Sequence, residues 1–261
     1  MENLVIKDVD FESIDDLVGL CVLQEKRSDP LYVRGMDAKK RWATEVIRKF
    51  GSIAKLAYLD SKPVGLIQYQ PNPEERVVKI DCIFVPEKAN LRKGIGKTLL
   101  KALIREMEKP KAAFNNSVPL ALVTQTFEVP GRYSQRDFFE RMGFRRVKED
   151  NPFLLYYPLE KGDVYQPREK LFIPQEEDLG KALIFYAPSC PFSIVFSERI
   201  KESISKIAPD LPIRMVNTFE EAEEVKKRGQ VPALVVNGKP IETFFTEKEN
   251  FQKEVKKALE S

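Results

Sequence analysis

Histidine is absent from this chain of 261 residues. Its absence excludes Ser-His and Cys-His nucleophilic pairs and any His-ligated metal, so we expect no metal. Acid–base chemistry must therefore use Asp, Glu, Tyr, Cys or Lys side chains. Cysteine is scarce as well: Cys21, Cys82 and Cys190 are widely spaced and odd in number. That pattern excludes a disulfide framework and a zinc spacing, and it indicates a reducing compartment.

Long apolar runs and a strong charge of one sign are also missing. No segment approaches the length of a membrane span, and residues 1–30 carry acidic side chains where a signal peptide requires a basic start and an apolar block. We therefore expect a cytoplasmic protein without a membrane partner. The 43 Lys and Arg residues alternate with 40 Asp and Glu residues, and the net charge of +3 is too small to indicate a nucleic-acid partner.

What is present is enough apolar sequence, 43% of the residues, for two hydrophobic cores. Hydrophobic periodicity predicts an α/β domain over residues 1–160, a polar linker with prolines over 161–180, and a second α/β domain over 181–261. The first domain reads as strand, two helices, three strands, helix, strand, helix, strand. The second reads as strand, helix, strand, helix, hairpin, helix. Caps are expected at Asp37, Ser134 and Thr218, and a hairpin turn at Asn237-Gly238.

A glycine pair, Gly94 and Gly96, opens an apolar-periodic helix in "NLRKGIGKTLL", residues 90–100. Backbone N–H groups at such a helix start favour a phosphate. A nucleotide P-loop requires glycine at the position of Leu91, and a dinucleotide fingerprint requires glycine at the position of Leu99. Both motifs are therefore incomplete here. A glycine-rich start of a packed helix, without any ligand, is the remaining interpretation from these residues alone.

The strand "IDCIFVP", the loop "RKGIGKT" and the later "FFERMGF" together resemble, in order and spacing, the acyl-CoA site of the GNAT (Gcn5-related N-acetyltransferase) superfamily. The resemblance covers residues 1–160 and implies a mixed, mostly antiparallel sheet flanked by helices. It implies acetyl-CoA as cosubstrate and an amine of a small molecule or peptide as acceptor. The family's leading Arg or Gln falls on Leu91, and the loop after Pro86 is longer than usual. The residues implied in cofactor binding are Ile83, Phe84, Val85, Arg92, Lys93, Gly94, Ile95, Gly96, Lys97 and Thr98.

The resemblance also implies catalytic residues. In the family a carboxylate takes a proton from the attacking amine, and this role falls on Asp81; a solvated strand residue is the alternative. Strand alternation predicts that Asp81 and Cys82 face opposite surfaces. The family's tyrosine that protonates the leaving thiolate is replaced by Phe139. Tyr133, nearby in sequence, is the candidate acid, and a proton from water is the alternative.

The acceptor side of the family's site is shaped by the first two helices and their connection, here residues 25–42. Tyr32, Arg34 and Trp42 are the side chains there that a ligand could contact. A helix packed on the sheet through Trp42 is the alternative. The residues do not identify the acceptor.

In the second domain, "FYAPSCPFS" and "QVPALVVNGKP" resemble the thioredoxin/glutaredoxin fold. This implies that Cys190 lies at a helix N-terminus beside a cis Pro232, with Ser193 replacing the usual second cysteine. A helix N-terminus stabilises a thiolate, so Cys190 is a candidate reactive residue; a scaffold domain with an inert Cys190 is the alternative. Together the two domains resemble bacterial two-domain acetyltransferases with a YoaP-like C-terminal region.

Three functional hypotheses follow from these patterns. The first is an N-acyltransferase that uses acetyl-CoA and carries an attached thioredoxin-like domain. The second is a thiol-redox or thiol-sensing protein whose N-terminal domain binds CoA as an effector. The third is a binding module in which neither domain does chemistry. The Phe139 departure keeps the second and the third hypotheses open.

Overall fold

The structure, a computed structural model, describes residues 4–127, 133–160, 162, 164–168 and 171–260. These residues group into two compact units, the first of Met1–Leu23 and Ala43–Arg168 and the second of Gln24–Trp42 and Glu169–Ser261. Helix α2 (Pro30–Phe50) therefore contributes its first half to the second unit and its last turns to the first. The domain bounds 1–160, 161–180 and 181–261 remain a prediction.

The first unit is built on a seven-stranded sheet with the order β1-β2-β3-β4-β5-β7-β6. All neighbouring strands are antiparallel except β4 and β5, which are parallel. The hairpin between β2 and β3 turns at Asp60 and Ser61, both in the left-handed region. The strands are β1 (Leu4–Asp8), β2 (Ala54–Leu59), β3 (Lys62–Asn72), β4 (Val77–Phe84), β5 (Ala121–Gln125), β6 (Arg145–Arg146) and β7 (Leu154–Pro158).

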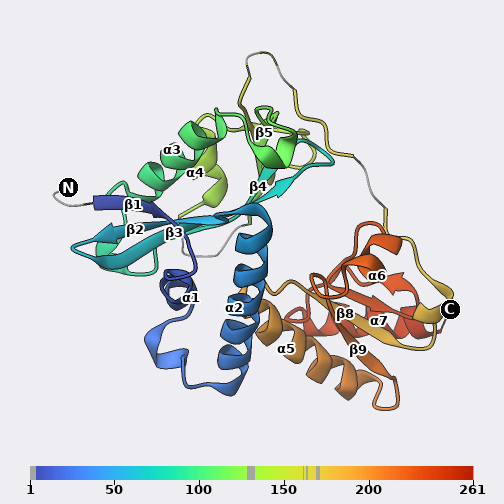
Figure 1. The fold of residues 1–261 in the computed structure, drawn as a ribbon. Coiled ribbons are helices and arrows are strands. Elements are labelled where there is room, and N and C mark those ends of the chain that lie inside the picture. Colours follow the sequence, from blue (N-terminus) through green and yellow to red (C-terminus); the bar gives the residue numbers. More distant parts are fainter. Residues whose placement is uncertain (1–3, 128–132, 161, 163, 169–170, 261) are drawn as a thin grey trace. The chain divides into compact units, whose positions relative to one another are not determined.

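Helices cover both faces of this sheet. Helices α3 (Ile95–Met107) and α4 (Gln135–Arg141) lie on one face, and α1 (Ile14–Cys21) lies on the other (Figure 1). The main core forms under α3, where the apolar spacing of Leu99, Leu100 and Leu103 meets Val78 and Ile80 of β4. The expected mixed α/β fold, a mostly antiparallel sheet flanked by helices, is confirmed for this unit.

The helix starts test the expected caps. Ser134 is confirmed, since its Oγ accepts a hydrogen bond from the N–H of Asp137 at 3.2 Å. The cap at Asp37 is wrong, because α2 begins seven residues earlier at Pro30. There the carboxylate of Asp29 accepts a hydrogen bond from the N–H of Leu31 at 2.9 Å, and proline fits the first helical position.

The second unit holds a four-stranded sheet with the order β11-β10-β8-β9, in which only β8 and β9 are parallel. Helices α5 and α7 pack on one face of it and α6 packs on the other. Among the described residues, no helix is both long enough and apolar enough to cross a membrane. The elements are β8 (Ala182–Tyr186), α5 (Pro191–Ile207), β9 (Ile213–Asn217), α6 (Ala222–Lys227), β10 (Leu234–Val236), β11 (Lys239–Pro240) and α7 (Lys248–Leu259).

Two turns in the second unit bear on the expectations. The hairpin turn at Asn237-Gly238 is confirmed, with φ of 50° and 74° at the two residues. The cap at Thr218 is wrong, because α6 begins at Ala222. The hydroxyl of Thr218 donates instead to the carbonyl of Tyr186 at 3.1 Å, which ties the end of β9 to the end of β8.

The segment expected to be a linker, residues 161–180, contributes to both units at its ends. Tyr165 is buried in the first unit, and its hydroxyl donates to the carboxylate of Glu75. In the second unit, the N–H of Ile173 donates to the carbonyl of Arg228 at 2.9 Å, and the buried guanidinium of Arg228 donates to Asp178 at 2.7 Å. Residues 171–180 are therefore part of the second unit, and a buried ion pair joins Asp178 to Arg228 within it.

Candidate functional site

The strands β4 and β5 of the first unit are paired over only part of the length of β4. Their parallel pairing runs from Val77 with Ala121 to Ile80 with Thr124. Beyond Ile80, strand β4 continues to Phe84 with β3 as its partner. The edge of β4 from Asp81 to Phe84 therefore has backbone N–H and C=O groups that the ladder to β5 does not use (Figure 1).

A β-bulge lies where the two strands part. On β3, Tyr69 pairs with Ile80 and Gln68 pairs with Cys82, so Asp81 is the extra residue on β4. Ile80 and Ile83 both contact the core under α3, although they are three residues apart. The predicted alternation of Asp81 and Cys82 is therefore wrong, because the extra residue puts both side chains on the face away from α3.

Asp81 is held in place on that face. Its side chain is only 13% exposed, and its Oδ2 accepts a hydrogen bond from the side-chain amide of Gln70 on β3. The ammonium group of Lys79 lies 3.8 Å from Oδ1. The alternative of a freely solvated strand residue does not fit this geometry, in which a carboxylate is oriented by a neighbouring strand.

The start of α3 presents open backbone donors. Gly94 precedes the helix with a φ of 76°, a conformation that favours glycine. The N–H and the hydroxyl of Thr98 both donate to the carbonyl of Gly94, at 2.9 and 3.1 Å. Among the described residues, no acceptor faces the N–H groups of Ile95, Gly96 and Lys97. These groups and the helix dipole make the turn attractive to an anion.

The predicted cofactor-binding residues come together around this turn. Arg92, Lys93 and Lys97 are exposed, and Arg92 has a φ of 60°. The apolar members pack inward: Ile83 and Val85 contact the core under α3, and Ile95 is buried. Phe84 is half-buried and pairs with Leu66 of β3. An added Cβ on Gly96 would lie 3.6 Å from the ring of Phe138 and 3.7 Å from Ile83.

Gly65 of β3 is a contributor that the sequence patterns missed. A Cβ on this residue would lie 3.0 Å from Ile95, 3.2 Å from Val85 and 3.3 Å from the carbonyl of Phe84. Glycine therefore allows β3 to approach both the end of β4 and the start of α3. A single glycine inside an apolar strand is the signal that could have pointed to such a close approach.

The candidate proton donor Tyr133 lies before α4. It is 58% exposed, and the guanidinium of Arg141 lies 5.9 Å from the centre of its ring. The interactions of Tyr133 and of Asp81 among the described residues do not join the two side chains. Phe139, at the position of the family's tyrosine, is buried in the core, with ring centres 5.2 Å from Phe138 and 4.9 Å from Phe144. A hydroxyl at this position is thus replaced by a packing side chain.

In the second unit, Cys190 is exposed and immediately precedes α5. The expected cis peptide at Pro232 is wrong, because no peptide bond in the described part of the chain is cis. All three cysteines are described, and none forms a disulfide. Cys190 belongs to a different unit from Asp81 and Gly96.

The side chains expected to contact the acceptor, Tyr32, Arg34 and Trp42, all belong to the second unit. Tyr32 packs edge-on against Phe192 with ring centres 5.5 Å apart, and Arg34 pairs with Glu198 at 2.8 Å. Trp42 is 3% exposed, which favours the packing interpretation.

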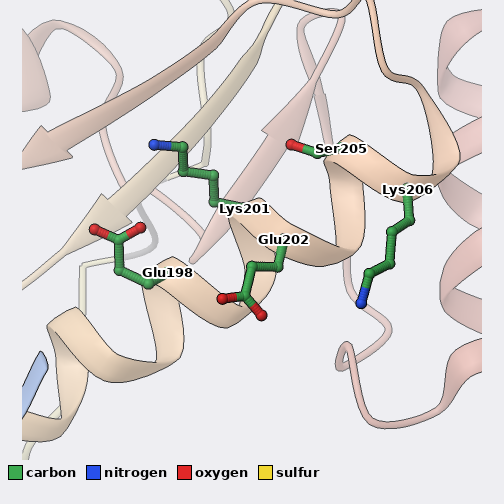
Figure 2. A pocket seen from close by; sticks show the side chains of 5 residues that line it. All are labelled: Glu198, Lys201, Glu202, Ser205 and Lys206. Atoms are coloured by element: carbon green, nitrogen blue, oxygen red, sulfur yellow. The ribbon is translucent and has the colours of Figure 1, made fainter. Parts of the chain in front are cut away.

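A shallow surface hollow also occurs along α5, and it carries no chemistry. All of its lining residues come from this one helix, and Figure 2 shows their side chains spreading in different directions. They are Glu198, Lys201, Glu202, Ser205 and Lys206. A site requires polar groups that converge on a ligand, so this hollow is not a candidate.

Comparisons with known proteins bear on the first unit. Residues 19–144 match the sequence model of the acetyltransferase (GNAT) family. No curated protein matches the chain. Among solved structures, PaiA N-acetyltransferase from Thermoplasma acidophilum, in complex with coenzyme A, shares 14% identity over 60% of this chain and 99% of its own, with a TM-score of 0.44.

Two further structures are similar to the same extent. A GNAT family acetyltransferase from Brucella melitensis, in complex with acetyl-CoA, shares 11% identity over 64% of this chain and 94% of its own, with a TM-score of 0.41. A GNAT family acetyltransferase from Staphylococcus aureus Mu50 shares 16% identity over 60% of this chain and 100% of its own, with a TM-score of 0.44. The family match itself lies on the strands and helices that form the parted sheet and the start of α3. Residues 19–144 of this chain are therefore similar to the acetyltransferase (GNAT) family.

Proposed function

We propose that the first unit transfers an acetyl group from acetyl-CoA to the amine of a small molecule or peptide. The observation that carries this proposal is the parting of β4 from β5 at Ile80, beside a helix start with open N–H groups. An extended thioester arm needs an unpaired strand edge, and a pyrophosphate needs converging N–H donors. The region that matches the GNAT family offers both.

The cofactor would be held mainly by main chain. The N–H groups of Ile95, Gly96 and Lys97 fit a pyrophosphate, and Gly96 has no side chain to obstruct it. The exposed Arg92 and Lys93 add positive charge beside it. The edge of β4 from Asp81 to Phe84 would pair with the pantetheine amides, as Ile83, Phe84 and Val85 were expected to do.

The proposed reaction is a direct transfer. Asp81 takes a proton from the acceptor ammonium, directly or through one water, and the freed amine attacks the thioester carbon. The C–N bond forms, the nitrogen gives its second proton to water, the C–S bond breaks and CoA leaves as a thiolate. That thiolate takes its proton from Tyr133 or from water, because Phe139 carries no hydroxyl. The backbone N–H groups of the open strand edge would stabilise the oxyanion.

The first experiment measures binding and transfer. We expect calorimetry to give saturable binding of acetyl-CoA, and thermal melting to move to higher temperature when acetyl-CoA is present. Mass spectrometry then follows acetylation of methylamine, a polyamine and a short peptide with a free amino terminus. Absence of binding at saturating acetyl-CoA contradicts the proposal. Binding without transfer to any amine favours the two other hypotheses, an effector role for CoA or a binding module.

The variant Asp81→Asn tests the base. The amide keeps the size of the side chain but cannot take a proton, so the transfer rate should fall roughly 10²- to 10⁴-fold. Affinity for acetyl-CoA should stay unchanged. A variant that binds acetyl-CoA and transfers at the wild-type rate would remove Asp81 from the mechanism.

We also propose that the second unit is a thioredoxin-like domain with Cys190 as its reactive thiol. The strand order β11-β10-β8-β9 and the exposed position of Cys190 before α5 support this proposal. The trans peptide at Pro232 counts against it. Mass spectrometry after mild oxidation tests it: because Ser193 cannot form an intramolecular disulfide with Cys190, a mixed disulfide or sulfenic acid on Cys190 is expected.

A further inference from the structure

The side chain of Gln70 has a contact that neither the core nor the sheet requires. Gln70 lies on β3 opposite Lys79 of β4, and its amide nitrogen donates to Oδ2 of Asp81, two residues further along β4. Diagonal neighbours on adjacent strands are within reach of a long side chain. Because alternate residues of a strand share a face, Asp81 lies on the same face as Lys79 and its partner Gln70, which makes this contact possible.

The contact leaves the two carboxylate oxygens in different surroundings. Oδ2 is engaged by the amide of Gln70, whereas Oδ1 has the Lys79 ammonium at 3.8 Å, on a side chain that is 61% exposed. Among the described residues, the groups that interact with the Asp81 carboxylate are thus one half-buried neutral donor and one exposed cation at longer range. The oxygen nearer the cation is the one without the amide donor and is available to accept a proton.

We propose that Gln70 is a positioning residue for the general base. This proposal rests on the proposed function, in which Asp81 takes the proton of the acceptor amine. By holding Oδ2, Gln70 fixes the rotation of the carboxylate and directs Oδ1 to the acceptor. A base that rotates freely spends less time in the reactive geometry, and small displacements cost large factors in rate.

A purely structural role for Gln70 is the competing explanation. Strands β3 and β4 are already joined by backbone pairing on both sides of the contact, from Leu66 with Phe84 to Asn72 with Val77. Removing one side-chain hydrogen bond at a half-buried position should therefore leave the sheet intact. Gln70→Leu keeps the approximate volume and removes the side-chain amide that donates to Asp81.

The experiment compares variants with methylamine as the acceptor probe. For Gln70→Leu we expect kcat to fall roughly 10- to 100-fold with affinity for acetyl-CoA unchanged. Gln70→Asn, which keeps an amide on a shorter side chain, should recover part of this loss. Gln252→Leu, the same change at an exposed position of α7 in the second unit, is the matched control and should match wild type.

The variant Gln70→Glu separates positioning from structure. At neutral pH its carboxylate cannot donate to Asp81 and repels it, so transfer should be slow. As the pH falls from about 8 to about 5.5, the pair takes up a proton and regains an O–H donor, and the rate relative to wild type should rise. The ratio for Gln70→Leu should stay constant over the same range.

The outcomes are distinguishable. Wild-type rates in Gln70→Leu, or equal pH dependence of the two variants, overturn the role of Gln70 while leaving the proposed transfer intact. A different result contradicts the proposed transfer itself, and this inference with it. In that result the wild-type protein binds acetyl-CoA but acetylates none of the amines tested, and Asp81→Asn is equally inactive.

Discussion

In each unit the sequence predicts a functional site at the start of a helix that follows a strand and a short loop. The two helix starts, of α3 and of α5, differ in their hydrogen bonding. At α3 in the first unit, the N–H groups of Ile95, Gly96 and Lys97 have no acceptor among the described residues. At α5 in the second unit, the first residue is Pro191, which has no N–H, and the N–H of Ser193 donates to the carbonyl of Cys190 at 3.0 Å. The side chain of Ser193 is also used, accepting from the N–H of Ala187 at 3.0 Å.

The packing of neighbouring atoms around the two helix starts also differs. Gly35 of α2 lies so close to α5 that a Cβ on it would come within 2.3 Å of the carbonyl oxygen of Pro191. At α3, a Cβ on Gly96 would meet its neighbours at ordinary contact distance. Helix dipoles act at both starts, but the start of α3 has three N–H groups without an acceptor among the described residues and no clash at its glycine. A helix N-terminus therefore indicates a ligand site only when its donors and the space before them are unused.

The largest expected effect is on acetyl-CoA binding at the start of α3. Gly96→Val puts two methyl groups where the backbone of the turn would approach a pyrophosphate. We expect acetyl-CoA affinity to fall about 100-fold, equivalent to about 2.7 kcal/mol. The fold should survive, because the nearest atoms, on Phe138 and Ile83, belong to side chains that can shift. Calorimetry with acetyl-CoA, beside a circular dichroism spectrum, checks both statements. Full affinity in a folded variant would assign the glycine pair to helix packing alone.

A matched pair of Gly→Ala substitutions compares the two regions directly. Gly35→Ala should destabilise the protein by roughly 1–3 kcal/mol, because the new methyl group meets a backbone oxygen that cannot move cheaply. Gly96→Ala should be neutral or stabilise by roughly 0.5–1 kcal/mol, since alanine favours a helix and no clash follows. Urea unfolding followed by the fluorescence of Trp42, the one tryptophan, measures the first change. Circular dichroism measures both. Equal stabilities would mean that the close approach at Gly35 is not maintained in solution.

Several features of the fold were predictable because they depend on neighbours in sequence. The periodicity of Leu99, Leu100 and Leu103 predicts α3, and Ser134 caps α4 through a bond to a residue three positions away. The error at Asp37, by contrast, is not decided by neighbours in sequence. Asp37 fits a cap as well as Asp29 does, but the helix extends to Pro30 because its first half packs in the second unit.

The geometry of the candidate site was less predictable because it depends on pairing between strands. The bulge at Asp81 is a property of the register between β3 and β4, which no single segment encodes. For the same reason Gln70 and Gly65 were missed, although a polar residue and a glycine in an apolar strand were visible signals. The family resemblance located Asp81 and the glycine pair, but not the contacts that orient them.

The smallest expected effect concerns Cys190. Both Cys190 and Cys82 are exposed, one before a helix and one on a strand, so Cys82 is its matched control. The dipole of α5 should favour the thiolate of Cys190. In its first turn, however, Pro191 has no N–H and the N–H of Ser193 is already engaged, so the advantage should be modest. We expect Cys190 to alkylate about three- to tenfold faster than Cys82 at mildly acidic pH, and the half-buried Cys21 to react more slowly than both. Mass-resolved alkylation of the native protein reports all three thiols in one sample. If Cys82 reacts as fast as Cys190, the start of α5 gives its cysteine no special reactivity, and the second unit is a scaffold.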